Sequence, residues 1–383
     1  MIRLQRNIEV ATFEVEATVA LSERRPEYLA VLRLAADLGR PLTARDVHRQ
    51  LFGNLPETVG RIVLDRCSLL GLFDRTRPGD PATLSSAGAL ALERGGILLA
   101  EEGLWRIYHA TDPLLGARPL HVQRLVDETN AQATREVLKK QRGRPQPGAP
   151  VPEAIRVGPG TSLVDGRPFE IRELSQRGGI GAQGSLRLHL EWSESDAIEL
   201  ALRGTLPGSP KEAPKVDRRL EVPAACKAWT HDRLWLALTA YATRTPLDEL
   251  TTWHTHTRKR LLPRVITDLD EATRRTARCE LTVPACRFPD LGTFEATRLA
   301  DVDIVPRAEP DAQAWAEWLQ WDGLSTYTTP TALQTAATAI AAKFPYHRPR
   351  LPTPQVLLQQ AIKNPADPRA RFLLAPADLG LWS

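Results

Sequence analysis

The chain has 383 residues, of which 42% are apolar and 25% charged, and this is the composition of a folded protein of two or three domains. It contains no apolar run long enough to cross a bilayer and no apolar leader at its start, so we expect no membrane partner and a cytoplasmic location. The net charge of +4 and the 42 arginines against 8 lysines are compatible with nucleic-acid binding, although a GC-rich genome also favours arginine.

The cysteines do not have the spacing of a metal site. Cys67, Cys226, Cys279 and Cys286 form no C-x-x-C pair, which argues against structural zinc and against a dense disulfide framework. We expect buried free thiols and neither a metal nor a cofactor.

The first predicted element is a strand over residues 8–21, where apolar and polar residues alternate. The alternation changes phase near Ala11 and Thr12, which predicts an irregularity in the strand.

A compact helical segment follows. Pro26 begins a helix that Gly39 ends, Thr43 is a good N-cap for a second, and Pro56 begins a third. In the second and third helices we expect the following apolar side chains to face inward: Val47, Leu51, Val59, Ile62, Val63, Leu69 and Leu70. Next, residues 72–84 predict a two-stranded hairpin, and Ser85 can cap a closing helix.

Three helices and a hairpin in this order, ending in "TLSSAGALALERG", resemble the winged helix-turn-helix superfamily over residues 26–95. The resemblance implies that the third helix enters the major groove of DNA and that the hairpin approaches a phosphate strand. On this basis the candidate DNA-binding residues are Thr58, Arg61 and Arg66 of the third helix and Arg75 and Arg77 of the hairpin.

The alternative is that this segment docks another protein subunit, because winged helices also serve that purpose. Glu57 and Asp65 lie on the third helix and would repel phosphate, so the predicted surface is only weakly basic. Both readings remain open at this point.

Residues 135–154 are rich in proline and glycine and predict a linker or exposed arm. Four further candidate DNA-binding residues stand at its front: Lys139, Lys140, Arg142 and Arg144.

Gly179-x-Gly181-x-x-Gly184 has the spacing of a dinucleotide-binding turn. Leucines alternate with polar residues after it, however, whereas a dinucleotide fold requires a helix at this point. We therefore interpret the glycines as a loop joining two antiparallel strands.

The remaining elements are strands over residues 155–223, helices over 224–278, strands over 279–306 and helices over 310–383. This order predicts an α+β fold with a mixed antiparallel-sheet and helical C-terminal region. The expected divisions are a winged-helix domain with its N-terminal strand at 1–134, the linker at 135–154, an α+β domain at 155–306 and a helical region at 307–383.

Two other patterns suggest catalytic chemistry. His254 and His256 fall on a helical stripe, and residues two apart on a helix point about 200° apart, so they cannot share a metal. Asp301 and Asp303 would share one face of a strand, as in a metal-dependent nuclease. We favour the interpretation that they form the polar face of an edge strand, because structural carboxylates outnumber catalytic ones.

Tryptophans 315, 318 and 321 are interpreted as packing residues, because their segment carries no arginine to accompany base stacking.

The functional expectation is a DNA-associated, non-catalytic accessory subunit of a DNA-processing or phage-defence assembly, with other protein subunits as partners. The alternatives are a scaffold subunit and a metal-dependent nuclease.

Overall fold

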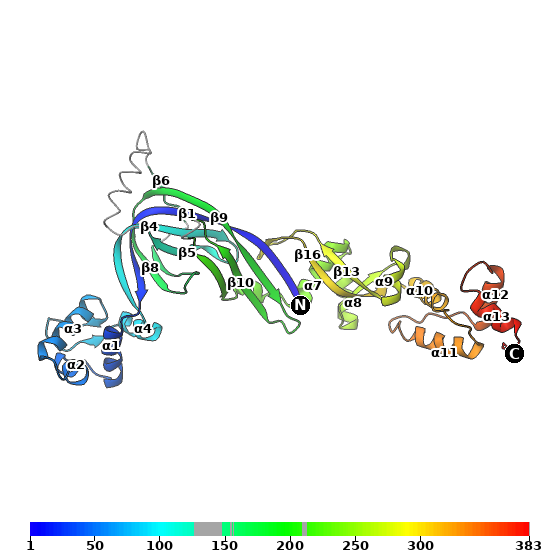
Figure 1. Ribbon diagram of the computed structural model, residues 1–383, viewed down its shortest axis with the longest axis horizontal. Helices are drawn as coiled ribbons and strands as arrows, with labels where there is room; N and C mark the ends of the chain where they lie inside the picture. Colours follow the sequence, from blue (N-terminus) through cyan, green and yellow to red (C-terminus); the bar gives the residue numbers. More distant parts are fainter. Residues whose placement is uncertain (126–147, 154, 156, 209–212, 383) are drawn as a thin grey trace.

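The computed structural model describes residues 1–125, 148–153, 155, 157–208 and 213–382. Its elements follow one long axis (Figure 1), with a four-helix module at one end, a curved sheet next to it and the C-terminal helices at the other end. The described part combines helices with mainly antiparallel sheet, so the predicted α+β class is confirmed. The charged arm residues Lys139, Lys140, Arg142 and Arg144 lie outside the described residues.

The central sheet is antiparallel, with the strand order β11-β10-β9-β1-β4-β5. Its strands are β1 (Ile2–Glu23), β4 (Ile97–Asp112), β5 (Gly116–Arg124), β9 (Arg177–Trp192), β10 (Ile198–Thr205) and β11 (Lys215–Leu220). Since β1 pairs with strands from both sides of residues 135–154, one sheet crosses the expected linker.

The irregularity predicted in β1 is present. The register with β9 shifts between Ala11 and Phe13, and the buried positions change from even to odd numbers across that shift. The extra residue of this bulge belongs to β9, because β1 pairs with β4 without interruption through the same region. The two sets of buried β1 side chains line two different cores, with Ile8 and Val10 in one and Phe13 and Val15 in the other.

Past the bulge, β1 also pairs with β8 (Pro168–Leu174), which pairs with β7 (Gly158–Thr161). A backbone hydrogen bond from Leu163 to Leu120 connects the turn after β7 to β5. These strands enclose a small apolar core whose fully buried side chains include Phe13, Trp105, Ile107, Phe169 and Ile171.

The glycine-rich stretch is not the loop that we expected. Arg177–Trp192 is a single strand, β9, whose glycine end pairs with β1 near the bulge and with the short strand β6 (Ala149–Pro150). A β-carbon on Gly181 would collide with the Thr12 hydroxyl, so glycine lets the two backbones approach there. No helix follows these glycines, which agrees with the rejection of a dinucleotide turn.

The helical module contains α1 (Pro26–Leu38), α2 (Ala44–Leu51), α3 (Glu57–Leu69), β2 (Phe73–Asp74), β3 (Thr83–Leu84) and α4 (Ser86–Arg94). Its predicted end signals are confirmed: Gly39 ends α1, Thr43 forms a capping box with Asp46, and Ser85 caps α4. An isolated bridge joins Leu42 to Ala82, next to the β2–β3 hairpin.

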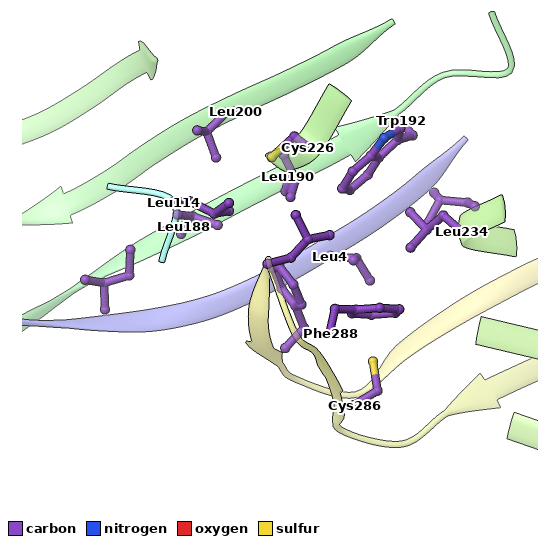
Figure 2. Close-up of a cluster of buried hydrophobic side chains, with 14 of the residues drawn as sticks. Leu4, Leu114, Leu188, Leu190, Trp192, Leu200, Cys226, Leu234, Cys286 and Phe288 are labelled. Carbon is purple, nitrogen blue, oxygen red and sulfur yellow. The ribbon is translucent and has the colours of Figure 1, made fainter. Parts of the chain in front are cut away.

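The largest core lies where β1, β9 and β10 meet the helix α7 (His231–Thr243) and the hairpin β14–β15 (Cys286–Phe288 and Gly292–Phe294). Figure 2 shows Leu4, Leu190, Trp192, Leu234 and Phe288 converging from these elements. This core joins the sheet to the C-terminal half of the chain.

The C-terminal half contains α6 (Ala224–Lys227), α8 (Leu247–Thr257), β12 (Leu261–Arg264), the 3-10 turn η1 (Ile266–Asp268), α9 (Glu271–Thr276), β13 (Arg278–Val283) and β16 (Thr297–Pro306). It ends in α10 (Glu309–Asp322), α11 (Pro330–Ala341), α12 (Pro354–Lys363) and α13 (Arg371–Asp378). Most of 224–278 is helical as predicted, but β12 is a strand, parallel to β16.

Within the described ranges no helix has the length and apolar composition needed to cross a bilayer.

Candidate nucleic-acid interface

The helix α3 packs on α2 through a glycine. A β-carbon on Gly60 would lie 2.5 Å from the Ala44 carbonyl oxygen and 2.8 Å from the His48 amide nitrogen, so only glycine allows this approach. Gly60, Leu64 and Cys67 form the buried stripe of α3. His48 also contacts the Leu55 carbonyl through Nε2 at 2.6 Å, which connects α2 to the turn before α3.

This packing fixes the outer surface of α3. Thr58, Arg61 and Arg66 are exposed, as the sequence predicted for residues that contact DNA. Within the described residues neither arginine of this set forms an ion pair, so both guanidinium groups are available to an anionic partner.

The expectation that Ile62 and Leu69 face inward is wrong. Ile62 is 58% exposed and Leu69 is 85% exposed, because the Gly60 stripe, and not the stripe through these residues, faces α2 and the core. Leu51 at the end of α2 was also expected to face inward and is 36% exposed. The outer surface of α3 therefore combines cationic and apolar side chains.

The two hairpin arginines differ in availability. The side chain of Arg75 is only 13% exposed, and its Nη1 lies 2.5 Å from Asp65 Oδ1, so its charge is already compensated. Arg77 is exposed near the tip. Asp65, which we expected to repel phosphate, is itself neutralised by Arg75, so this ion pair removes one cation and one anion from the predicted surface.

Two exposed cations of α2 were missed by the sequence analysis. Arg45 and Arg49 are exposed and lie one helical turn apart. Their spacing of four residues within the predicted second helix was a usable signal. Arg40 is exposed too, but both of its terminal nitrogens are held by the carboxylate of Asp46, each at 2.9 Å.

The candidate nuclease residues Asp301 and Asp303 are both exposed on β16. Asp303 pairs with Arg278 at 3.0 Å, and Asp301 has a positive φ of 51° beside the register shift of the β13–β16 pair. Glu295 forms a two-pronged pair with Arg187, at 2.8 and 2.6 Å. In the part of the chain that is described, no three potential ligands gather into a metal-binding group.

The two histidines lie on α8, so the expected helical setting is confirmed. His254 is partly buried and contacts Asp232 at 3.2 Å, whereas His256 is exposed. They do not form a joint ligand set.

The thiols are suited to packing and not to nucleophilic chemistry. All four cysteines are free, and only Cys279 is partly exposed. Burial raises the pKa of Cys67 to about 12 and that of Cys226 to about 11, so both stay protonated near neutral pH.

The outer side of α3 combines exposed arginines that form no ion pair in the described residues with exposed apolar side chains. We define the α3 surface as Thr58, Arg61, Ile62, Arg66 and Leu69. Comparisons with protein-family models, with curated proteins and with solved structures each found no match, so the properties of this surface must be argued from its residues.

Proposed function

We propose that residues 26–95 form a winged helix-turn-helix domain that contacts DNA through the α3 surface. The order of elements supports this reading: α1, an extended residue at Leu42, α2, α3 and the β2–β3 hairpin, closed by α4. The close crossing of α2 and α3 at Gly60 is the packing that a helix-turn-helix needs.

The observation that carries the proposal is the exposure of Arg61 and Arg66 on α3 without carboxylate partners in the described residues. Arginine binds phosphate or guanine through two parallel hydrogen bonds, and a free guanidinium does not first have to break an ion pair. Arg77 at the hairpin tip, and Arg45 and Arg49 on α2, add exposed positive charge to the same module.

In the described residues outside the module no group of potential metal ligands supports a catalytic role, and the bulk of the chain is unlike that of a small repressor. We therefore propose a non-catalytic accessory subunit of a DNA-processing or phage-defence assembly, with the module at one end of a long molecule and other protein subunits bound elsewhere (Figure 1).

Fluorescence anisotropy with a labelled duplex, measured over a range of salt concentrations, tests DNA contact. We expect affinity to fall as salt rises, and the double variant R61Q/R66Q to reduce the slope of log K against log salt by about 2, which is about one unit for each lost phosphate contact. Arg33 is an exposed arginine of α1, outside the α3 surface, so R33Q is the matched control and should leave the slope nearly unchanged. Equal slopes for the parent chain and R61Q/R66Q would refute the proposal.

A second candidate function is protein docking through the same helix, and the exposure of Ile62 and Leu69 favours it. Apolar side chains in these positions fit the buried centre of a protein interface better than they fit a phosphate strand. Replacement of both by serine should then abolish subunit association at moderate salt and leave duplex affinity close to that of the parent chain. The arginine variant should show the opposite pattern if DNA is the partner.

A further inference from the structure

A pocket of about 310 Å³ lies in the C-terminal half of the chain, between α9, the end of β16, α10 and residues 343–347. Its size is at the lower end of the range for small-molecule sites, roughly 300–1,000 Å³. It is therefore large enough for one ring system with a small charged group.

Aromatic side chains form much of its wall. Trp315 and Phe344 are buried in an edge-to-face contact with 5.9 Å between ring centroids, and Trp315 Nε1 donates a hydrogen bond to the Arg274 carbonyl. Tyr346 also lines the pocket and makes an edge contact with Trp253 at 6.1 Å. These contacts hold the rings in place before any ligand binds.

The charge at the pocket is of one sign. Arg274, Arg275 and Lys343 line it, and no lining residue is a carboxylate. Arg275 is held by Asp322 at 2.7 Å and by Glu271 at 3.0 Å. Within the described ranges Arg274 and Lys343 form no ion pair, although Arg274 lies near enough to Asp270, the N-cap of α9, to add to the capping hydrogen bonds that lower the pKa of that carboxyl. The lining of the pocket therefore carries net positive charge.

One polar atom at this site lacks an acceptor. Arg274 Nε is shielded from solvent and has no hydrogen-bond partner in the described structure, while its guanidinium lies over the ring of Trp318 at 5.4 Å. A buried donor without an acceptor is costly, and an anion bound beside it would remove that cost. Trp318 also has Arg275 near its ring, at 5.9 Å, so α9 supplies the arginines that the tryptophan segment lacks.

We propose that this pocket binds a nucleoside phosphate, with the base against the aromatic wall and the phosphate at Arg274 and Lys343. Aromatic rings and guanidinium planes stack on bases, and arginine and lysine bind phosphate oxygens. The ligand is either a free mononucleotide or the 5′-phosphorylated end of a single strand, which share this chemistry. The inference uses no residue of the α3 surface and stands apart from the proposal of duplex binding.

Isothermal titration of the full chain with adenosine monophosphate, adenosine and inorganic phosphate tests the site. We expect the nucleotide to bind about tenfold or more tightly than either fragment, because only it engages both the rings and the cations. R274Q should weaken nucleotide binding by about tenfold. The matched control is R278Q, because Arg278 is an exposed arginine of the next strand outside the pocket; it should bind like the parent chain.

If R274Q unfolds at a lower temperature than the parent chain, K343Q replaces it, because Lys343 is exposed and its substitution does not disturb a core. Single-stranded oligonucleotides with and without a 5′-phosphate separate the two sources. If only the 5′-phosphorylated oligonucleotide displaces the mononucleotide, the ligand of the pocket is a strand end. If the mononucleotide binds and neither oligonucleotide displaces it, the ligand is a free mononucleotide. The proposal is overturned if neither the mononucleotide nor the phosphorylated strand binds, or if the pocket variants bind them as tightly as the parent chain does.

Discussion

The buried ion pair between Arg6 of β1 and Asp112 of β4 holds the Arg6 side chain where it contacts the C-terminal half, so its loss should be costly. The two side chains are 8% and 7% exposed, and Arg6 Nη2 lies 2.7 Å from Asp112 Oδ1. Arg6 Nη1 donates to the Leu291 carbonyl in the β14–β15 turn, and its guanidinium lies over the ring of Phe294 at 4.6 Å. The Arg6 side chain of β1 thus contacts both β4 and the β14–β15 hairpin.

Substitution of Asp112 by asparagine keeps the shape of the side chain but leaves the buried guanidinium without its counter-charge. Removal of one partner of a buried ion pair typically costs about 3–5 kcal/mol, so we expect the free energy of unfolding of D112N to fall by this amount. R6M should lower the free energy of unfolding by a similar amount, because Asp112 then remains buried as an unpaired charge. The double variant D112N/R6M should lose clearly less stability than the sum of the losses of the two single variants.

Urea unfolding followed by tryptophan fluorescence measures these changes. The matched control is R3M, because Arg3 also lies on β1 but its pair with Glu191 is exposed, at 66% and 34%. That surface pair should contribute at most about 1 kcal/mol. If D112N and R3M lose the same stability, or if the two core substitutions are additive, the buried Arg6–Asp112 pair does not stabilise the fold as argued.

Three further predictions concern the module and the sheet. G60V should destabilise the helical module by about 1–3 kcal/mol and abolish duplex binding, because its side chain collides with α2. G53A is the control for proteolysis and anisotropy measurements, because a β-carbon there makes only an ordinary contact, 3.7 Å from the Arg49 carbonyl oxygen. D65N should raise duplex affinity several-fold at low salt, because it removes a carboxylate and releases Arg75; unchanged or weaker binding would contradict this. Burial lowers the pKa of His121 below its ordinary value of 6.5, so the unfolded chain binds more protons and stability is lost as pH falls below about 6.5. H121Q should lose less stability than the parent chain in urea unfolding between about pH 7 and pH 5.5, and parallel losses would show that His121 does not contribute.

Features determined by neighbouring residues could be predicted from the sequence. Gly39, Thr43 and Ser85 ended or capped their helices as expected, because a cap depends on residues within one turn of it. The register irregularity near Ala11 was also predicted, since the change from even to odd apolar positions is visible in the alternation of β1 itself, although nothing local placed the extra residue on β9.

Features determined by non-local packing could not be predicted. The apolar residues of α3 allow more than one inward stripe, and the choice between them is made by Gly60, whose importance appears only when α2 lies against it. As a result Ile62 and Leu69 are exposed. In the same way, the sequence does not indicate that Arg75 forms an ion pair, because its partner Asp65 lies ten residues away on another element.

The tryptophans show the same difference between local and non-local information. Their segment has no arginine, so its sequence indicates packing, and Trp315 does pack and donate to a backbone carbonyl as expected. Trp318, however, lies beside Arg274 and Arg275 of α9. A basic and aromatic cluster built from residues more than 40 positions apart leaves no spacing in the sequence that could identify it.

The two proposed sites lie in opposite parts of a long molecule, and this arrangement makes their variants mutually informative (Figure 1). Substitutions with no shared contacts are additive unless a conformational change couples them. R61Q/R66Q should therefore alter duplex binding and leave mononucleotide binding unchanged, and R274Q should do the reverse. If instead duplex DNA changes the affinity of the pocket for the nucleotide, the nucleotide must change duplex affinity by the same factor, because coupling between two binding sites is reciprocal. Arg6 makes a buried contact with the Leu291 carbonyl of the hairpin, whereas the Arg187–Glu295 pair beside it is more exposed. Because Asp112 holds Arg6 in place, D112N should weaken any such coupling.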